Sequence, residues 1–369
     1  MFVKKDKNTV KVYEQQNAIE KDWKIERYYL QKSYVEDKLK SFWVNPGDII
    51  VSCAGTIGEL YELPNEAEKG VINQALMRIR VHQNLVNTSL FEMSFSNMIS
   101  DFTKLHSNGS AIKNIPQFSE LKKISFLVPK LNEEQDSLVN FFKDFESIIT
   151  LHQRKLDKLK NIKKALLEKM FPRNGENIPE VRFKGFSDDW EQRKLNELAE
   201  FNPKCNLPNS FEYVDLESVV GTEMISSRYE IKENAPSRAQ RLAKKGDVFY
   251  QTVRPYQRNN YLFDKEENNY VFSTGYAQLR PNCNSRYLLN LLQTDSFVNI
   301  VLNNCTGTSY PAINSSDLGN IHVTTTKNIR EQTKIGEIFY RLDNLITLHQ
   351  RKLDKLKNIK KALLEKMFV

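Results

Sequence analysis

Residues 149–171 read ITLHQRKLDKLKNIKKALLEKMF, and the same 23 letters return unchanged as residues 346–368, 197 positions later. Weaker matches precede each copy at nearly the same offset: Glu134-Gln135 with Glu331-Gln332 at 197, Gly109-Ser110 with Gly307-Thr308 at 198, and Gly47-Asp48 with Gly246-Asp247 at 199. Offsets that drift by one residue at a time are what a tandem duplication with small insertions produces. We therefore expect two half-molecules.

The two halves have diverged unevenly. Residues 1–131 and 172–327 retain few matches to each other, whereas the closing segments are identical. A segment that stays identical contacts the same partner twice, and a segment that diverges contacts a different partner in each copy. Recent recombination that homogenised the closing segments is the alternative, and it would carry no functional meaning.

The closing segments predict amphipathic helices, because their apolar residues recur at steps of three and four. This stripe comprises Leu156, Leu159, Ile162, Leu166 and Met170 in the first copy, and Leu353, Leu356, Ile359, Leu363 and Met367 in the second. Asn132 with Gln135, and Asn328 with Glu331, predict capping boxes at the helix starts. Pro172 ends the first helix.

The helix over 132–171, if unbroken, is about 60 Å long at 1.5 Å per residue, and a break near Thr150 would shorten it. Two such apolar stripes cannot both remain in water. We therefore expect helices 132–171 and 328–369 to pack antiparallel as a coiled-coil-like rod.

The basic charge of the chain is concentrated on these helices. Each identical segment holds seven basic residues against two acidic ones, a net charge of +5, while the whole chain carries +8 at a pI near 9.0. The two copies therefore account for +10, and the rest of the chain for −2. Such a face suits phosphate or an acidic partner subunit, although a merely solvated lysine face fits equally well.

Composition excludes several other classes of protein. The 369 residues suffice for two or three domains. The mean hydropathy is −0.55, and no apolar run approaches the length that a membrane span requires. No secretory signal follows Met1, so the cytoplasm is the expected location. Four scattered cysteines (Cys53, Cys205, Cys283 and Cys305) are expected as small core residues, and the five histidines lack metal-ligand spacing, so no metal is expected.

Outside the helices, short β-rich runs separated by Gly, Pro and Asn predict mixed α/β domains. The expected strands are 48–52, 76–81 and 124–128 in the first half, and 247–251, 276–279 and 321–324 in the second. The expected organisation is a first globular domain at 1–131, a helix at 132–171, a second globular domain at 172–327 and a helix at 328–369.

Two loops of the second half carry the residue types that read DNA. Arginine pairs bidentately with guanine, Asn and Gln pair with adenine, and Tyr stacks on bases or holds phosphate. The candidates are Arg254, Tyr256, Arg258, Asn259 and Asn260, with Arg238 and Arg241 upstream and Tyr310 downstream. The matching loops of the first half offer Ser52, Thr56 and Lys113, which are small or isolated. For each of these loops, the alternative remains open that it is only an ordinary surface loop or a strand-to-strand turn.

No catalytic residues can be assembled. The sequence lacks GxxxxGK[ST], GxGxxG and GxSxG motifs, and it has no run such as an amino-methyltransferase uses to hold an extruded base. Asp215 with Glu230 and Lys232 has a nuclease-like spacing that random charged sequence often supplies. A stand-alone nuclease and a structural protein whose rod tethers two protein-binding domains remain the rival hypotheses.

Across essentially its whole length the chain resembles the specificity subunit of type I restriction-modification systems. The resemblance rests on the duplicated helix, on GTSYPAI at 307–313, on SRAQRLAKKGDVFYQTVRPYQRNN at 237–260 and on the leader VRFKGFSDDW at 181–190. It implies two target recognition domains that each read one half of a split DNA site. The implied half-sites lie in successive major grooves, roughly 34–36 Å apart.

The resemblance also implies partners. The helices would set the half-site separation and dock two adenine methyltransferase (modification) subunits, and restriction subunits would join them. S-adenosylmethionine and ATP with Mg²⁺ would bind to those subunits, so no cofactor is expected on this chain. One departure is that nothing equivalent to the leader precedes the first domain, so Met1 is expected to lie inside the first copy.

Overall fold

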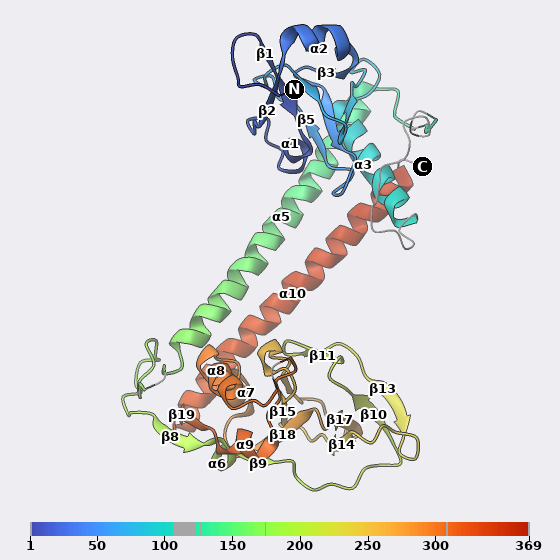
Figure 1. The fold of residues 1–369 in the computed structure, drawn as a ribbon. Helices are drawn as coiled ribbons and strands as arrows, with labels where there is room; N and C mark the ends of the chain where they lie inside the picture. Colours follow the sequence, from blue (N-terminus) through green and yellow to red (C-terminus); the bar gives the residue numbers. More distant parts are fainter. Residues whose placement is uncertain are drawn as a thin grey trace. The chain divides into compact units, whose positions relative to one another are not determined.

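A computed structural model describes residues 2–105, 121, 123–125, 127–173, 175–307 and 309–367. The chain forms two compact units, one made of Met1–Leu151 and Lys352–Val369 and the other of His152–Arg351. Two long helices, α5 (Asn132–Lys169) and α10 (Ile329–Met367), each contribute to both units (Figure 1).

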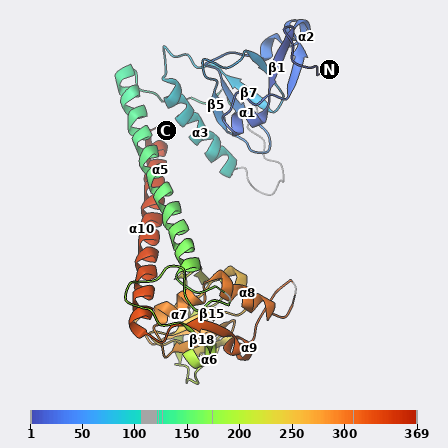
Figure 2. The same cartoon turned by 90° about the vertical axis from the view of Figure 1, so that its left-hand side faces the viewer.

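Both long helices are unbroken, so the break considered near Thr150 does not occur. In the second unit, His152 of α5 contacts His349 of α10, and Lys163 of α5 forms an ion pair with Asp343 of α10 at 2.5 Å. From the first contact to the second, the residue number rises along α5, from 152 to 163, and falls along α10, from 349 to 343. The two helices therefore run antiparallel, as expected (Figure 2). In the first unit, Lys360 of α10 forms an ion pair with Glu146 of α5.

The line of residues that faces the other helix, here called the seam, does not include every residue of the predicted apolar stripe. Leu156 and Leu353 are each 1 % exposed, as expected, but Ile162 and Ile359 are each 38 % exposed. Lys163, the neighbour of Ile162, lies seven residues after Leu156 and faces the seam, where its ammonium pairs with Asp343. A seam between two helices alternates steps of three and four residues, seven residues for each two turns. The predicted stripe takes two consecutive steps of three from Leu156, which places Ile162 one residue before the seam position that Lys163 occupies. The rest of the predicted set is buried or half-buried: Leu159, Leu166, Met170, Leu356, Leu363 and Met367.

The first unit contains two small sheets, with strand orders β2-β1-β6-β3 and β5-β4-β7. Short helices cover them, and α3 packs Phe95 and Ile99 onto Ile49 and Val51 of β4. The elements are β1 (Thr9–Tyr13), α1 (Gln15–Ile19), β2 (Tyr28–Gln31), α2 (Lys32–Lys38), η1 (Lys40–Phe42), β3 (Trp43–Val44), β4 (Ile49–Ser52), β5 (Leu60–Glu62), β6 (Gly70–Ile72), β7 (Leu76–Ile79) and α3 (Thr88–Leu105).

The second unit repeats this plan with the orders β13-β10-β17-β14 and β16-β15-β18-β9, and adds two-stranded pairs β19-β8 and β11-β12. Its elements are β8 (Glu191–Lys194), α6 (Leu195–Leu198), β9 (Ala199–Phe201), β10 (Ser210–Val214), β11 (Val219–Val220), β12 (Glu223–Met224), β13 (Arg228–Ile231), β14 (Ala239–Leu242), β15 (Val248–Gln251), η2 (Pro255–Gln257), β16 (Tyr261–Leu262), β17 (Tyr270–Ser273), β18 (Tyr276–Pro281), α7 (Ser285–Leu291), α8 (Asp295–Asn303), α9 (Ser315–Asn320) and β19 (His322–Thr325).

Equivalent turns show that the two units share a fold. Asp48 is 2 % exposed and accepts two hydrogen bonds of 2.6 Å from Arg80, and Asp247 is 1 % exposed and accepts two of 2.9 Å from Arg280. The glycine before each aspartate has a positive φ, 81° and 95°, which a side chain would strain. The Gly-Asp matches seen in the sequence are therefore structural equivalents.

One strand prediction is wrong. Five of the six predicted strands are present as β4, β7, β15, β18 and β19, but Ile124, Ser125, Leu127 and Val128 are not in a strand. A strand needs a partner, and β19 has one in β8. No described segment of the first unit offers that pairing to the corresponding residues.

The capping boxes form only in part. Asn328 accepts hydrogen bonds from the backbone N–H groups of Arg330 and Glu331 at 3.1 and 3.4 Å, as a helix cap does. The Glu331 carboxylate does not close the box, because it is fully buried and paired with Arg182 at 2.6 Å. In the first copy, the Gln135 amide likewise bonds elsewhere, to Asn87 and to the Leu85 and Pro129 carbonyls.

Candidate nucleic-acid interface

The loop at 252–260 leaves the buried strand β15 and returns as β16. Thr252 anchors its start, because the hydroxyl donates to the Gly275 carbonyl at 2.8 Å. The 3₁₀ turn η2 follows, flanked by Arg254 and Arg258, both in the left-handed backbone region at φ 54° and 56°. Left-handed backbone at non-glycine residues is costly, and it persists where the surrounding structure fixes it, often at functional sites.

A second loop, distant in sequence, is tied to the first. The Arg254 N–H donates to the Pro311 carbonyl at 2.8 Å, and the Ile313 N–H donates to the Thr252 carbonyl at 3.0 Å. The Arg254 guanidinium lies over the Tyr310 ring, 4.4 Å from its centre. The fold therefore brings together two stretches that lie about 60 positions apart in the sequence.

Four candidate side chains are available at the surface here. Tyr310 is 64 % exposed, Tyr256 is 50 % exposed and Arg238 is exposed. Arg254 is half-buried and forms no ion pair with any described residue, so its N–H groups keep free hydrogen-bonding capacity. A cation stacked on an exposed aromatic ring is a typical surface for bases and phosphates.

Three other candidates are used inside the protein. Arg258 donates to the Gln293 carbonyl at 2.9 Å and pairs with Asp295, which lowers the pKa of that carboxyl group. Asn259 accepts a hydrogen bond from the Gly221 N–H at 2.8 Å. Asn260 is 1 % exposed and accepts from the Gln251 N–H, so its proposed contact with a base is wrong for this conformation.

Arg241 lies on β14 and is half-buried. Its Nε atom is buried without a hydrogen-bond partner among the described residues, and this loss of solvent lowers the pKa of the guanidinium. The position beside Cys205 gives it no anionic partner.

The corresponding loop of the first unit, residues 52–58, is built differently. Ser52 is fully buried and its hydroxyl accepts from the Glu59 N–H at 2.9 Å, so the expectation that it contacts DNA is wrong for this conformation. Thr56 is exposed, and its carbonyl accepts from the Gln15 amide at 3.2 Å. Lys113 and the loop at 109–113 lie outside the described residues.

The identical helices expose most of their basic side chains. Arg154, Lys155, Lys158, Lys160 and Lys164 are exposed, and none of them forms an ion pair with a described residue. Lys163 and Lys169 are half-buried, and they pair with Asp343 and Glu180. The exposed basic face is therefore open to an anionic partner.

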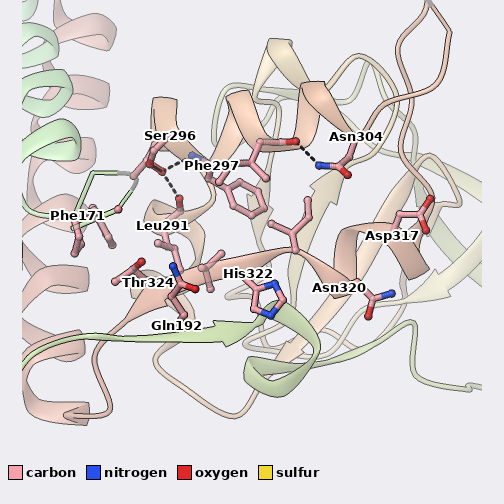
Figure 3. Close-up of a pocket in the computed structure, with 16 residues that line it drawn as sticks. Phe171, Gln192, Leu291, Ser296, Phe297, Asn304, Asp317, Asn320, His322 and Thr324 are labelled. Carbon is pink, nitrogen blue, oxygen red and sulfur yellow. Dashed lines mark hydrogen bonds between the residues drawn. The ribbon is translucent and has the colours of Figure 1, made fainter. Parts of the chain in front are cut away.

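A pocket of about 540 Å³ lies in the second unit between the end of α5, the helices α8 and α9, and the strand β19 (Figure 3). Its walls mix apolar Phe171 and Phe297 with polar His322 and Asp317. The Ser296 hydroxyl donates to Thr294 at 3.2 Å rather than to His322, so no nucleophile and base are paired there.

The described residues contain no group of three or more His, Cys, Asp or Glu side chains placed to hold a metal ion. They also contain no helix that is both long and apolar enough to cross a membrane. The four cysteines are free thiols, but Cys205 is exposed, so the expectation that all four lie in the core is wrong for that one.

Sequence reasoning matched Gln135 with Gln332 across the repeat but missed their contacts with the globular part of each unit. Gln332 accepts from the Asn284 N–H at 3.0 Å and donates to the Thr326 carbonyl at 2.7 Å. Gln135 makes the same contacts with Asn87 and Pro129, 197 positions earlier. The signal was present, because all three positions follow the offset of the identical helices.

Comparison with known proteins agrees with this architecture. The model of the type I restriction modification DNA specificity domain matches residues 4–161 and again 187–358. The specificity subunit of type I restriction enzyme MjaVIII from Methanocaldococcus jannaschii is 21 % identical over 380 residues, covering 94 % of this chain and 87 % of that protein. The specificity subunit of type I restriction enzyme HindI from Haemophilus influenzae is 26 % identical over 195 residues, 49 % of this chain and 41 % of that protein.

Solved structures share the fold. The S subunit of a type I restriction-modification system from M. genitalium has a TM-score of 0.53 at 16 % identity, covering all of this chain and 90 % of its own. A chain from a type I restriction-modification system studied for complex assembly has a TM-score of 0.54 at 15 % identity, covering 97 % and 91 %. With its two matches to the family model, this chain belongs to the type I restriction-modification DNA specificity family and carries the family's domain twice.

Proposed function

We propose that this chain is the DNA specificity subunit of a type I restriction-modification complex, in which each unit reads one half of a bipartite DNA site. The observation that carries the proposal is that equivalent loops of a duplicated fold hold different side chains. The second unit presents Arg254 on Tyr310, whereas the first presents the short loop 52–58. One fold with two different loops suits two different half-sites.

Phosphate neutralisation would supply most of the affinity and base contacts the selectivity. Arg254 is the strongest candidate for a base contact, because its guanidinium lies over the Tyr310 ring without an acidic partner among the described residues. Tyr256 and Arg238, both exposed, would then hold the backbone. Arg258 would act indirectly, by fixing the loop on α8.

The chain itself is proposed to be non-catalytic and to act in the cytoplasm. Two modification subunits would dock along the exposed basic faces of α5 and α10, since identical surfaces fit identical partners. Those subunits would bind S-adenosylmethionine and methylate adenine N6, and restriction subunits would supply ATP- and Mg²⁺-dependent cleavage.

The central test replaces one arginine and reads the methylation motif. Arg254→Ala is expected to relax the sequence preference in one half-site only, at a cost of about 1–3 kcal/mol if the contact is bidentate. Arg330→Ala, which removes an exposed arginine outside the loops, is the matched control and should leave the motif unchanged. Equal change in both half-sites would refute the assignment of one unit to each half-site.

Charge reversal tests the docking part separately. Lys158→Glu with Lys355→Glu is expected to weaken assembly with the modification subunits, or overall DNA affinity, without altering the sequence read. Lys232→Glu, an exposed position in the second unit, is the control. If the reversal changed the motif but not the assembly, the docking assignment would be wrong while the reading assignment could stand.

A further inference from the structure

The loops at 52–58 and 252–260 turn at equivalent positions of the duplicated fold. The offset of 199 that relates the paired Gly-Asp turns makes Gly55 the counterpart of Arg254. Both residues have left-handed backbone, at φ 65° and 54°. Glycine takes this conformation without strain, whereas an arginine has to be held in it by its surroundings. The second unit therefore needs contacts that fix the backbone at Arg254.

In the second unit, a buried glutamine holds this backbone. Gln251 ends β15 and is 2 % exposed. Its Nε2 amide donates to the Val253 carbonyl at 2.7 Å and to Gln257 Oε1 at 2.8 Å. The Val253 carbonyl shares one planar peptide unit with the Arg254 N–H, which donates to Pro311. Both polar groups of this peptide unit are therefore fixed, and they set the direction in which the Arg254 side chain leaves the loop.

The first unit holds the same carbonyl by another route. Gln15, the first residue of α1, donates from its Nε2 amide to the carbonyls of Ala54 and Thr56, to the latter at 3.2 Å. Ala54 is the counterpart of Val253 at the offset of 199. The two glutamines are not counterparts of each other, because Gln15 lies on a helix and Gln251 on a strand. An equivalent carbonyl thus accepts a glutamine amide in both units, from two different elements.

The core of the second unit gains little from the Gln251 carboxamide. Its Oε1 atom is buried without a hydrogen-bond partner among the described residues. An unpaired buried acceptor lowers stability, so an apolar side chain of the same length would suit the core better. What the carboxamide contributes is its two hydrogen bonds to the loop.

We propose that Gln251 and Gln15 are the positioning residues of the two loops, and that each sets the base preference of one half-site without contacting DNA. This inference rests on the proposed function and extends it, since it gives the first unit a residue on which reading depends. Gln251 acts through Arg254. Gln15 acts through the backbone around Gly55, where the missing side chain lets the peptide itself approach a base.

The test replaces each glutamine by methionine, which has nearly the same length but no strong hydrogen-bond donor. The methylation motif is then read in genomic DNA from cells that carry the variant gene. Gln251→Met should reduce the base preference in one half-site by about tenfold, and Gln15→Met should do so in the other. Gln15→Lys keeps a donor and should restore part of the preference. Near-UV circular dichroism reports folding, and the half-buried Gln15 carries the test if Gln251→Met does not fold.

Two other glutamines are the matched controls. Gln278 is 1 % exposed and donates to the Leu242 carbonyl at 2.8 Å and to Asp247 at 2.6 Å, with no hydrogen bond to the loop. Gln278→Met should therefore lower the melting temperature and leave the motif unchanged. Gln16 is exposed and next to Gln15, and Gln16→Met should change neither property.

Different outcomes overturn different statements. If Arg254→Ala relaxes one half-site but Gln251→Met and Gln15→Met leave the motif unchanged, the positioning role is wrong and the proposed function stands. If both methionine variants relax the same half-site, the assignment of one glutamine to each loop is wrong. A motif relaxed by Gln278→Met would mean that lost stability alone alters reading, which also removes the positioning role. If Arg254→Ala leaves the motif unchanged as well, the proposed function fails and the inference fails with it.

Discussion

His152 and His349 are the same residue of the repeat, and their Nδ1 atoms lie 3.0 Å apart. Equivalent residues meet in this way only where a local two-fold axis passes between them. One imidazole donates and the other accepts, and the rings are tilted by 45°. The duplication is therefore used at this point as a self-complementary contact between helices.

A double-mutant cycle tests this histidine pair. His152→Leu and His349→Leu should each destabilise the chain, and the double variant should be less destabilised than the sum, by about 0.5–1.5 kcal/mol. Urea unfolding measures the three free energies. The control pairs His152→Leu with His322→Leu, an exposed residue with no contact to His152, and should be additive. Additivity in the first cycle would show that the imidazoles do not interact.

Arg258→Ala should destabilise the second unit in a pH-dependent way. Arg258 holds the pKa of the Asp295 carboxyl below its usual range, so the ion pair stabilises the fold above that usual value. Its contribution is lost as the pH falls through the lowered pKa. We expect Arg258→Ala to lower the free energy of unfolding by about 1 kcal/mol at pH 7, and this difference from the unchanged chain should shrink below roughly pH 4. Thermal unfolding of both forms from pH 3 to 7 checks this, and a gap that widens in acid would contradict it.

Gln332→Ala should lower the free energy of unfolding by more than an average surface substitution does. Gln332 is 4 % exposed, and its loss leaves the Asn284 N–H and the Thr326 carbonyl without that partner, at about 1–3 kcal/mol. Gln135→Ala should cost a similar amount in the first unit, where the residue is 1 % exposed. Gln153→Ala, at a half-buried residue whose amide donates to Asp157 of the same helix at 3.0 Å, is the matched control. Chemical denaturation followed by circular dichroism distinguishes them.

Thiol alkylation should be strongly selective. Burial raises the pKa of Cys53 and Cys283 to about 11, so only about one thiol in a thousand is ionised at pH 8. Cys205 is exposed and should react first with iodoacetamide. Peptide mass spectrometry over a time course measures the order. Equal rates for Cys205 and Cys283 would show that the region around Cys283 opens readily.

The sequence predicts regular, repeated features better than features that depend on tertiary partners. The long helices, their antiparallel packing and the paired Gly-Asp turns follow from periodicity and offset. The strand expected at 124–128 fails because strand formation depends on a neighbour. Within the candidate site, residue type identified Arg254 and Tyr310 but could not separate them from Ser52 and Asn260, whose side chains the folded domain buries.

The last residues of α10 belong to the same compact unit as the first 151 residues of the chain. Leu353 and Leu364 of this segment are buried, at 1 % and 9 % exposure. The first unit is therefore assembled from both ends of the sequence, and a fragment that ends before residue 352 lacks part of it. A stop codon after Arg351, though it lies at the far end of the gene, would damage the domain encoded at its beginning.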